Sequence, residues 1–190
     1  AGHEVESMNP DYCKDTSNTT LNFHNGKILS AWYNAGRVYS LDPLTLETAG
    51  EQDFSGGLDT PMNAHGKTDP RTGEFINYGY ADFQPWLTYY VISPDGKVKH
   101  RTRIDLPGPR LPHDTTITPN YTILHDFPLF HDLEVLKRTG HRVVQFRRDL
   151  PGSDILHWGE GTVSVARDVI SHEGRLSPGP DYKLYLARRY

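Results

Sequence analysis

Two of the ten histidines in this 190-residue chain are spaced so that they could act together. His65 lies in MNAHGK and His113 lies 48 residues later in RLPHDT, each at the start of a predicted strand. Neutral imidazole is a good ligand for Fe, Zn, Cu and Ni, whereas carboxylates alone favour Mg, Ca or Mn. If the fold brings the two rings together, they predict a transition-metal site. The alternative is that both are strand-end histidines whose nitrogens bond to backbone groups.

The elements that must position these histidines are short strands. Segments with alternating, β-branched or aromatic residues are separated by turns that use the 14 prolines and 17 glycines, and helical periodicity is nearly absent. The predicted strands cover residues 19–24, 27–33, 37–41, 74–80, 87–92, 97–104, 121–125 and 142–147. The C-terminal LSPGPDYKLYLARRY reads as a loop followed by a strand-like end. The predicted fold class is therefore all-β.

An Asp–Pro or Pro–Asp turn recurs between these strands. Asp42 in LDPLTLE, Asp69 in TDPRTGE and Asp95 in SPDGK follow one another after 27 and 26 residues. Proline presets φ, and the aspartate side chain closes the turn on its own backbone. One strand pair about every 26 residues gives a four-stranded sheet about every 50, which is typical of β-propeller blades. A β-sandwich would have the same strand content, but the repeated turn favours the propeller.

The interval between His65 and His113 is then one blade. Equivalent positions of successive blades face the same central axis, so two such histidines would converge there. A chain of 190 residues makes only about three to four blades and cannot by itself close a ring that hides its edges. The sequence predicts a partial β-propeller, with blades over residues 1–150 and a divergent segment of the same domain over residues 151–190. A longer chain or an oligomer would complete the ring.

Composition argues against several other classes of protein. The net charge of −4 provides no basic field for nucleic acid. No apolar run reaches the ~18 residues of a membrane-spanning helix, although peripheral membrane contact stays open. The single cysteine, Cys13, and the lack of a signal-peptide pattern in AGHEVESMNP favour a reducing, cytoplasmic compartment. The sequence contains no Gly-x-Ser-x-Gly elbow, phosphate-binding glycine loop or Cys-x-x-Cys pair. Their absence favours metal chemistry or simple ligand binding as the function.

Three other histidines are predicted to be exposed. His24 ends a strand beside a glycine and reads as a solvated turn residue. His100 alternates with charged residues in KVKHRTR, which indicates an exposed side chain. His131, in ILHDFPLFHD, reads as a surface-loop residue, and a role beside the metal or the substrate is the alternative.

Over residues 18–150 the chain resembles the carotenoid cleavage oxygenases, which also include stilbene-cleaving dioxygenases and the retinal pigment epithelium isomerase. The resemblance rests on DPLTLET, on AHGKTDPRTGE and on LPGPRLPHD, in this order along the chain. It implies a seven-bladed β-propeller with an axial Fe(II) held by four histidines, which adds O2 across a carbon–carbon double bond. Matched residue by residue, His65 corresponds to the first iron ligand and His113 to the second.

The third and fourth ligands of the family are not recognisable in this chain. The third belongs at the end of a W-F-E…H motif, but the nearest match, HWGEGTVSVARD, places Asp168 where histidine is expected. His172 could replace it only if the local register differs, and Asp168 with two histidines would form a 2-His-1-carboxylate triad. The fourth belongs near the end of a chain more than twice this long. Tyr33 and Asn34 stand where the family tends to have a glutamate that supports its ligands.

The resemblance implies a non-haem Fe(II)-dependent dioxygenase whose partners are O2 and an apolar conjugated substrate, either a carotenoid or apocarotenoid or a stilbene-like molecule. Trp32 stands in a region where stilbene cleavers often have lysine, which favours an apolar polyene or apocarotenoid. The alternative, from another class, is a non-catalytic propeller-derived module that binds an apolar ligand and has lost a complete iron site. A calcium-dependent propeller hydrolase is disfavoured, because it would need Asp, Glu or Asn at the axial positions.

Overall fold

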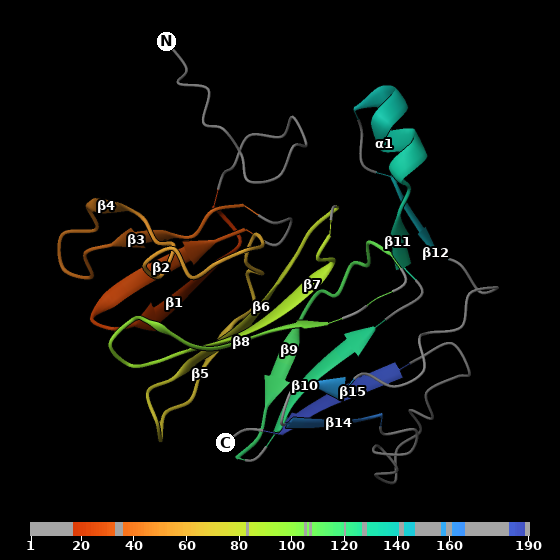
Figure 1. Ribbon diagram of the computed structural model, residues 1–190. Helices are drawn as coiled ribbons and strands as arrows, with labels where there is room; N and C mark the ends of the chain where they lie inside the picture. Colours follow the sequence, from red (N-terminus) through yellow and green to blue (C-terminus); the bar gives the residue numbers. More distant parts are fainter. Residues whose placement is uncertain are drawn as a thin grey trace, which may run out of the picture.

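The structure is a computed structural model. It describes residues 17–32, 36–82, 84–104, 106, 108–119, 121–126, 129–140, 143–146, 157–158, 161–165 and 183–188; residues 125–126 and those from 146 onward are described only as strand backbone. The described part of the chain is built almost entirely of short antiparallel strands in separate sheets (Figure 1).

The first sheet is a four-stranded antiparallel meander. It contains β1 (Thr20–His24), β2 (Lys27–Ala31), β3 (Tyr39–Leu41) and β4 (Thr48–Glu51), hydrogen-bonded in this order. The hairpin between β1 and β2 turns at Asn25 and Gly26, whose φ angles are 49° and 69°. Two consecutive positive φ angles match the right-handed strand twist and favour Asn–Gly at this turn. The turn after β3 is closed by Asp42, whose carboxylate accepts hydrogen bonds from the backbone of Leu44 and Thr45.

The second sheet repeats this arrangement. It contains β5 (Lys67–Thr68), β6 (Phe75–Tyr80), β7 (Leu87–Ile92) and β8 (Val98–Ile104), again in sequence order. The buried carboxylate of Asp69 accepts a hydrogen bond from Arg71 N at 2.9 Å, so the turn between β5 and β6 is closed in the same way as the turn at Asp42. Two of the three predicted aspartate turns are therefore confirmed. In the third, between β7 and β8, Ser93 Oγ accepts the hydrogen bond from Lys97 N at 3.3 Å, and Asp95 accepts one from Ser93 Oγ instead.

The third sheet combines strands from two distant parts of the chain. Its order is β13 (His157–Trp158), β14 (Gly161–Val165), β15 (Lys183–Arg188), β10 (Tyr121–Asp126) and β9 (Thr115–Ile117). A separate two-stranded ladder pairs β11 (Leu129–His131) with β12 (Val144–Phe146). The predicted C-terminal strand is therefore present, as β15.

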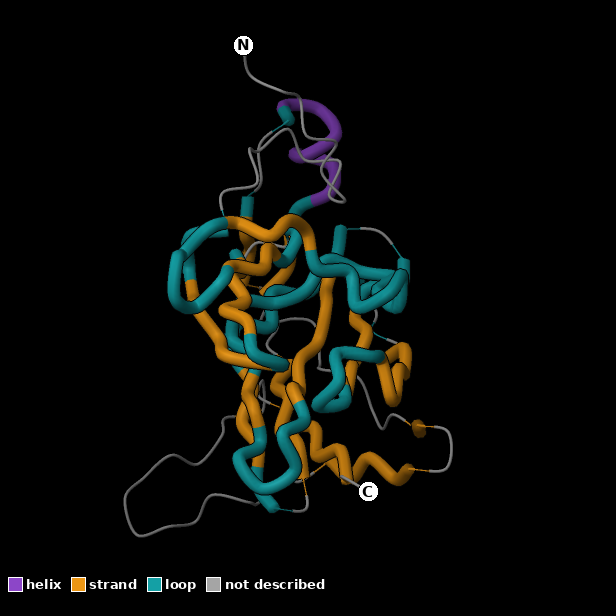
Figure 2. The backbone as a smooth tube through the Cα atoms, turned by 90° about the vertical axis from the view of Figure 1, so that its left-hand side faces the viewer, coloured by secondary structure: helices purple, strands orange, loops and turns teal. Residues whose placement is uncertain are grey.

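One short helix, α1 (Leu133–Thr139), departs from the expectation that helices are nearly absent. Asp132 caps its N-terminus by accepting hydrogen bonds from Glu134 N and Val135 N, and Gly140 ends it at a φ of 70°. The helix buries none of its residues and projects beyond the sheets (Figure 2). Its seven residues are too few to show helical periodicity, which explains why the sequence did not predict it.

The three sheets are arranged as successive blades. Each begins with its inner strand, and these strands start at Thr20, Lys67 and Thr115, which are 47 and 48 residues apart. β1 contacts β5 and β5 contacts β9, so the inner strands are neighbours. The predicted partial β-propeller and its blade length are confirmed. Within the described part of the chain, no helix has the length and apolar character needed to cross a membrane.

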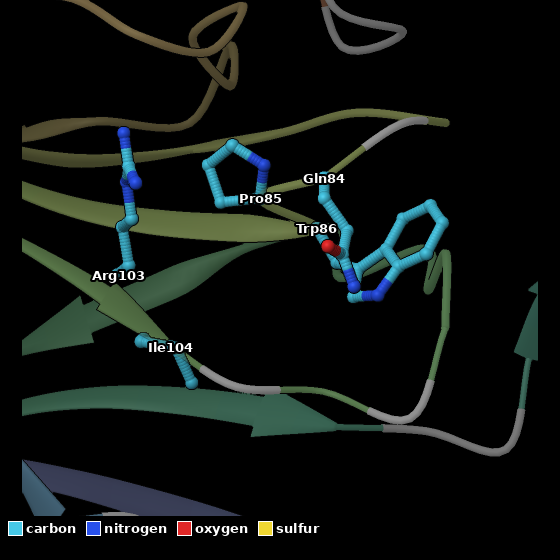
Figure 3. A pocket seen from close by; sticks show the side chains of 5 residues that line it. All are labelled: Gln84, Pro85, Trp86, Arg103 and Ile104. Carbon is cyan, nitrogen blue, oxygen red and sulfur yellow. The ribbon is translucent and has the colours of Figure 1, made fainter.

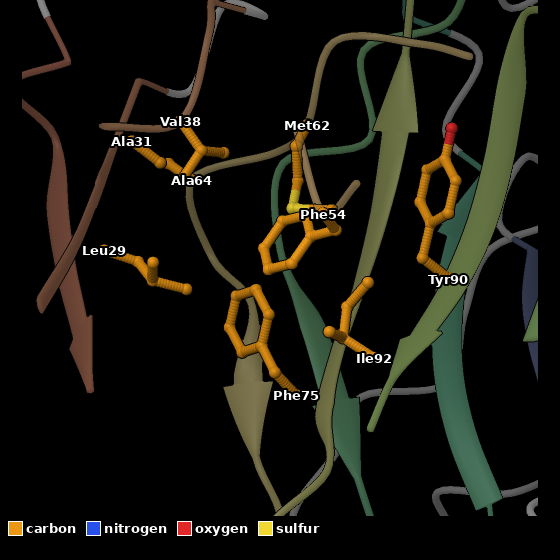
Figure 4. Close-up of a cluster of buried hydrophobic side chains, with 9 residues drawn as sticks. All are labelled: Leu29, Ala31, Val38, Phe54, Met62, Ala64, Phe75, Tyr90 and Ile92. Carbon is orange, nitrogen blue, oxygen red and sulfur yellow. The ribbon is translucent and has the colours of Figure 1, made fainter. Parts of the chain in front are cut away.

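Apolar side chains fill the two spaces between neighbouring blades. Between the first and second sheets, Leu29, Phe54, Met62 and Phe75 are each no more than 2% exposed and pack together (Figure 4). Between the second and third sheets, a second cluster joins residues of β6, β7 and β8 to Leu124 of β10. Burial of each large apolar side chain contributes about 1.5–3 kcal/mol. These contacts hold the inner edges of the blades in place.

The eight predicted strands are all present, with ends within two residues of those predicted. The sequence missed β4, β5, β9, β11 and β13, which have two to four residues each, and β14, which has five. An alternating pattern is not recognisable over such a length.

Candidate metal centre

His65 and His113 lie side by side at the inner edge of the propeller. Their ring centroids are 4.8 Å apart and the ring planes are inclined by 38°. His65 comes two residues before β5 and His113 two residues before β9, which are the inner strands of neighbouring blades. The proximity expected from the one-blade spacing is therefore observed. Their role as metal ligands stays a prediction.

The segment before His65 is held against β6. Asn63 N donates to Tyr78 O at 2.8 Å, and Tyr80 N donates to Pro61 O at 3.1 Å. Gly79, opposite Met62, permits this close approach, because a Cβ there would lie 2.0 Å from Thr60 Oγ1 and 2.3 Å from Pro61 O. The backbone that carries His65 is thus fixed by a rigid central strand.

A single buried side chain connects the two histidine segments. The Asn63 side chain accepts a hydrogen bond from His65 N at 2.6 Å and donates one to His113 O at 3.1 Å. The Tyr78 hydroxyl donates to Pro112 O at 2.9 Å and also pairs with the Asn63 amide. Both side chains are fully buried. Burial raises the pKa of Tyr78 well above 10, so its hydroxyl remains a donor.

A second link between the blades carries charge. Lys67 Nζ donates to His65 O and to Asp114 Oδ1, at 2.8 Å in each case. Burial alone would raise the pKa of the Asp114 carboxyl, but the hydrogen bonds from Lys67 and Thr115 N hold it below its usual value. Asp114 is therefore ionised at neutral pH and pairs with the ammonium of Lys67.

The protonation state of His65 suits a metal ligand. Burial lowers the pKa of His65 below 6.5; the negative charge of Asp114 opposes this shift, and His113 and Lys67 add to it. The ring is therefore neutral at pH 7, as metal coordination requires. Its Nε2 is buried and has no hydrogen-bond partner among the described residues. A buried polar atom without a partner is unfavourable, and a metal ion would satisfy it.

The described residues supply no third ligand. They contain no group of three or more His, Cys, Asp or Glu side chains placed to hold a metal. Asp168 and His172, the two predicted candidates for the missing position, lie outside the described residues, as do Tyr33 and Asn34. Among the described residues, the candidate site thus consists of His65 and His113.

Three expectations for other histidines were wrong. His24 is only 3% exposed and packs on Phe75, with ring centroids 5.6 Å apart. His131 is 5% exposed and its Nδ1 pairs with the buried carboxylate of Asp82. His100 is half-buried, and its Nε2 lies 2.8 Å from Thr102 Oγ1. His24 and His131 end their strands at positions that looked solvated in the sequence, and distant segments of the chain cover both.

An open pocket of about 470 Å³ lies elsewhere, where β7 begins and β8 ends (Figure 3). It is lined by Gln84, Pro85, Trp86, Arg103 and Ile104. Trp86 also packs on the cluster between the second and third sheets. Neither His65 nor His113 lines the pocket, so it is separate from the candidate metal centre.

Comparison with known proteins identifies the family. The sequence profile of the retinal pigment epithelial membrane protein family matches residues 4–157, which is most of the chain. The chain belongs to this family. Among the members of the family it resembles, the carotenoid 9,10(9',10')-cleavage dioxygenase of Crocus sativus is 34% identical over 146 residues. This match covers 75% of the chain and 27% of the relative.

Two further members of the family show the range of relatives. The resveratrol cleavage oxygenase 1 of Aspergillus fumigatus is 37% identical over 131 residues, covering 67% of the chain and 26% of the relative. The crystal structure of Pseudomonas brassicacearum lignostilbene dioxygenase matches with a TM-score of 0.64 and 35% identity, covering 72% of the chain and 29% of that structure. The chain spans about a quarter of the length of the curated relatives it matches.

Sequence reasoning found the two histidines but missed Asn63, Tyr78, Lys67 and Asp114. One local signal pointed to Asn63: an asparagine side chain can accept a hydrogen bond from the backbone N–H of the residue two positions later. Nothing in the sequence indicated that the same amide reaches His113, which is 50 residues away.

Proposed function

We propose that the protein is a non-haem Fe(II)-dependent dioxygenase that cleaves a carbon–carbon double bond, with His65 and His113 as two of its iron ligands. The observation that carries this proposal is the pair of adjacent imidazoles, 4.8 Å apart, with a buried and unpartnered Nε2 on His65. Imidazole nitrogen is a ligand suited to iron. Family membership and the dioxygenase relatives support the same chemistry.

The residues of this chain would hold and support the metal. The iron, when bound, would supply the activation of O2. His65 remains neutral because burial lowers its pKa, so it needs to release no proton to bind the metal at pH 7. Asn63 and Tyr78 fix the backbone behind both imidazoles, and Lys67 ties the His65 carbonyl to Asp114. The remaining ligands would come from other parts of the protein.

The substrate we propose is an apolar conjugated alkene of the carotenoid, apocarotenoid or stilbene type. Relatives named for the cleavage of carotenoids, resveratrol and lignostilbene support this class. Trp32, which is half-buried, favours the apolar polyene over a phenolic stilbene.

The ring of propeller blades would be completed by further blades or by another subunit. Peripheral contact with a membrane would give the protein access to an apolar substrate. We also propose a cytoplasmic location, and that residues 151–190 belong to the same domain as residues 1–150.

A non-catalytic binding module is the second candidate. It is favoured by the finding that the described residues provide two histidines and no third ligand. Such a module would bind an apolar conjugated molecule without stoichiometric iron and without consuming O2.

Anaerobic loading with Fe(II), followed by measurement of iron per chain, separates the two candidates. The proposed enzyme retains about one iron per chain after desalting, and His65→Ala and His113→Ala each lose it. His100→Ala, a half-buried histidine of the outer strand β8, is the matched control and keeps its iron. Wild-type protein with no iron above the level of the His65→Ala/His113→Ala double variant would contradict the iron site and favour the binding module.

Activity is tested with the loaded protein, an apocarotenoid or resveratrol, and O2. The proposed reaction consumes one O2 per alkene cleaved and gives two carbonyl products, which chromatography with mass detection resolves. Loss of both products in His65→Ala and in His113→Ala is expected.

A further inference from the structure

We propose that Asn63 is a positioning residue of the metal centre: its carboxamide sets the separation of His65 and His113 and thereby the affinity for the metal. This inference rests on the proposed iron site. Asn63 would not touch the metal, since its side-chain atoms are already engaged with the backbone of both histidine segments.

The Asn63 side chain accepts a hydrogen bond from one blade and donates one to the next. Oδ1 accepts from His65 N at 2.6 Å, in the segment that leads into β5 of the second sheet. Nδ2 donates to His113 O at 3.1 Å, in the segment that leads into β9 of the third sheet. One rigid amide plane therefore joins the backbones of the two proposed ligands, whose residues are otherwise 48 positions apart in the sequence.

The chemistry of the two backbone groups requires a carboxamide. A backbone N–H can only donate and a carbonyl oxygen can only accept, so the bridging side chain must present an acceptor to His65 and a donor to His113. Asparagine has both on one planar group. An ionised aspartate would keep the acceptor but would place a second oxygen against the His113 carbonyl, and alanine would remove both bonds.

The surroundings of Asn63 hold its amide in this orientation. Asn63 is fully buried, and its backbone carbonyl accepts a hydrogen bond from Asn77 Nδ2 at 2.7 Å. The Tyr78 hydroxyl donates to Pro112 O at 2.9 Å and so accepts from Asn63 Nδ2. Every polar atom of the Asn63 side chain thus has a partner, and rotation of the amide would break bonds to both blades. The backbone segments that carry the two imidazoles are therefore positioned without a bound metal.

The test measures metal binding to the purified chain. Cu(II) is the probe, because it binds imidazole more tightly than Fe(II) does, and pulsed electron paramagnetic resonance counts the imidazoles bound to it. The His65→Ala/His113→Ala double variant gives the background from the other histidines. We expect two imidazoles per Cu(II) in the wild-type chain. In Asn63→Ala we expect one imidazole, with a dissociation constant raised about 10–100-fold.

A matched control removes a buried hydrogen bond away from the metal centre. Tyr89→Phe deletes the bond between Tyr89 Oη and Thr122 Oγ1, which are 2.8 Å apart and buried between the second and third sheets. We expect this variant to bind Cu(II) as the wild-type chain does. Asn63→Asp is the second test variant, because it keeps the size of the side chain and the acceptor for His65 N while losing the donor to His113 O. We expect it to weaken binding as well.

The outcomes separate this inference from the proposed function. If folded Asn63→Ala or Asn63→Asp binds Cu(II) through two imidazoles with the wild-type dissociation constant, Asn63 does not position the ligands. If Tyr89→Phe weakens binding as much as Asn63→Ala does, the effect is one of general stability and the inference is again wrong. If the wild-type chain binds no more Cu(II) than the double histidine variant, the proposed metal site itself is wrong.

Discussion

At the scale of single residues, burial sets the protonation of the histidines. His24, His65 and His100 each have a pKa lowered mainly by burial. A histidine in this state is neutral at pH 7 and can offer a lone pair. Only His65 among these three has a second imidazole next to its ring in the described structure. The same physical effect thus gives a potential ligand at one position and an ordinary core residue at another.

The buried state of His24 makes the free energy of unfolding depend on pH. Burial lowers its folded-state pKa below 6.5, and weaker hydrogen bonds to the backbone of Ser93 and Gly73 oppose this shift. As the pH falls, the unfolded chain therefore binds a proton before the folded chain does. The free energy of unfolding decreases from about pH 6.5 down to the folded-state pKa of His24. We expect the His24→Gln variant to lose less stability than the wild type between about pH 7 and about pH 5.

Urea denaturation at a series of pH values measures this effect. His65 and His100 remain in both proteins, so the difference between the two pH profiles belongs to His24. Parallel profiles for the wild type and His24→Gln would show that His24 is not buried in its neutral form.

At the scale of elements, the inner edge of the second blade depends on one close backbone contact. The segment carrying Asn63 and His65 pairs with β6 at Gly79, where no side chain fits. Since β6 lies between β5 and β7 and is completely buried, it cannot move aside. The position of the proposed metal ligands is therefore set by a strand that contains none of them.

Gly79→Ala tests this dependence. The new methyl group would lie 2.0 Å from Thr60 Oγ1 and 2.3 Å from Pro61 O, so the segment must shift. We expect a loss of about 1–3 kcal/mol in the free energy of unfolding and a weaker Cu(II) site. Gly108→Ala is the control, because its nearest atoms are 3.9 Å away. Equal stability and equal Cu(II) affinity of the two variants would refute the proposed role of this contact.

At the scale of the whole molecule, the apolar clusters between the blades predict that the blades unfold as one cooperative unit. Leu124 of the third sheet is 2% exposed and packs against residues of the second sheet, including Ile76 and Leu87. The Tyr89–Thr122 hydrogen bond joins the same two sheets. Because the inner strands also touch, separating one blade would expose the apolar surface of its neighbour.

Leu124→Ala is therefore expected to destabilise both sheets together. Its effect on the free energy of unfolding is about 2–5 kcal/mol, measured by urea denaturation. In a background where Trp32 and Trp158 are replaced by phenylalanine, Trp86 fluorescence reports on the second sheet. This signal and far-ultraviolet circular dichroism should shift to the same lower midpoint. Tyr121→Ala, at a position that is 41% exposed on the same strand, should shift neither by much. Separate midpoints for the two probes would show that the blades unfold independently.

The sequence by itself determined eight of the internal strands, the turns at Asp42 and Asp69, and the length of the blade. These features depend on neighbouring residues: Asn25 and Gly26 accept positive φ angles, and Asp42 and Asp69 bond to backbone two residues away. The blade length then predicted that His65 and His113 would meet. Local chemistry was sufficient for this, because one repeated unit brings equivalent positions to the same edge.

Only the tertiary structure decided which side chains are covered and what supports the two histidines. His24 and His131 lie beside turns or loops in the sequence, yet segments from 49 to 51 positions away bury them against Phe75 and Asp82. Asn63 reaches His113 across a blade boundary in the same way. Burial and bridging hydrogen bonds of this kind depend on packing between distant segments. Burial and bridging hydrogen bonds at a position therefore cannot be predicted from the residues next to it in the sequence.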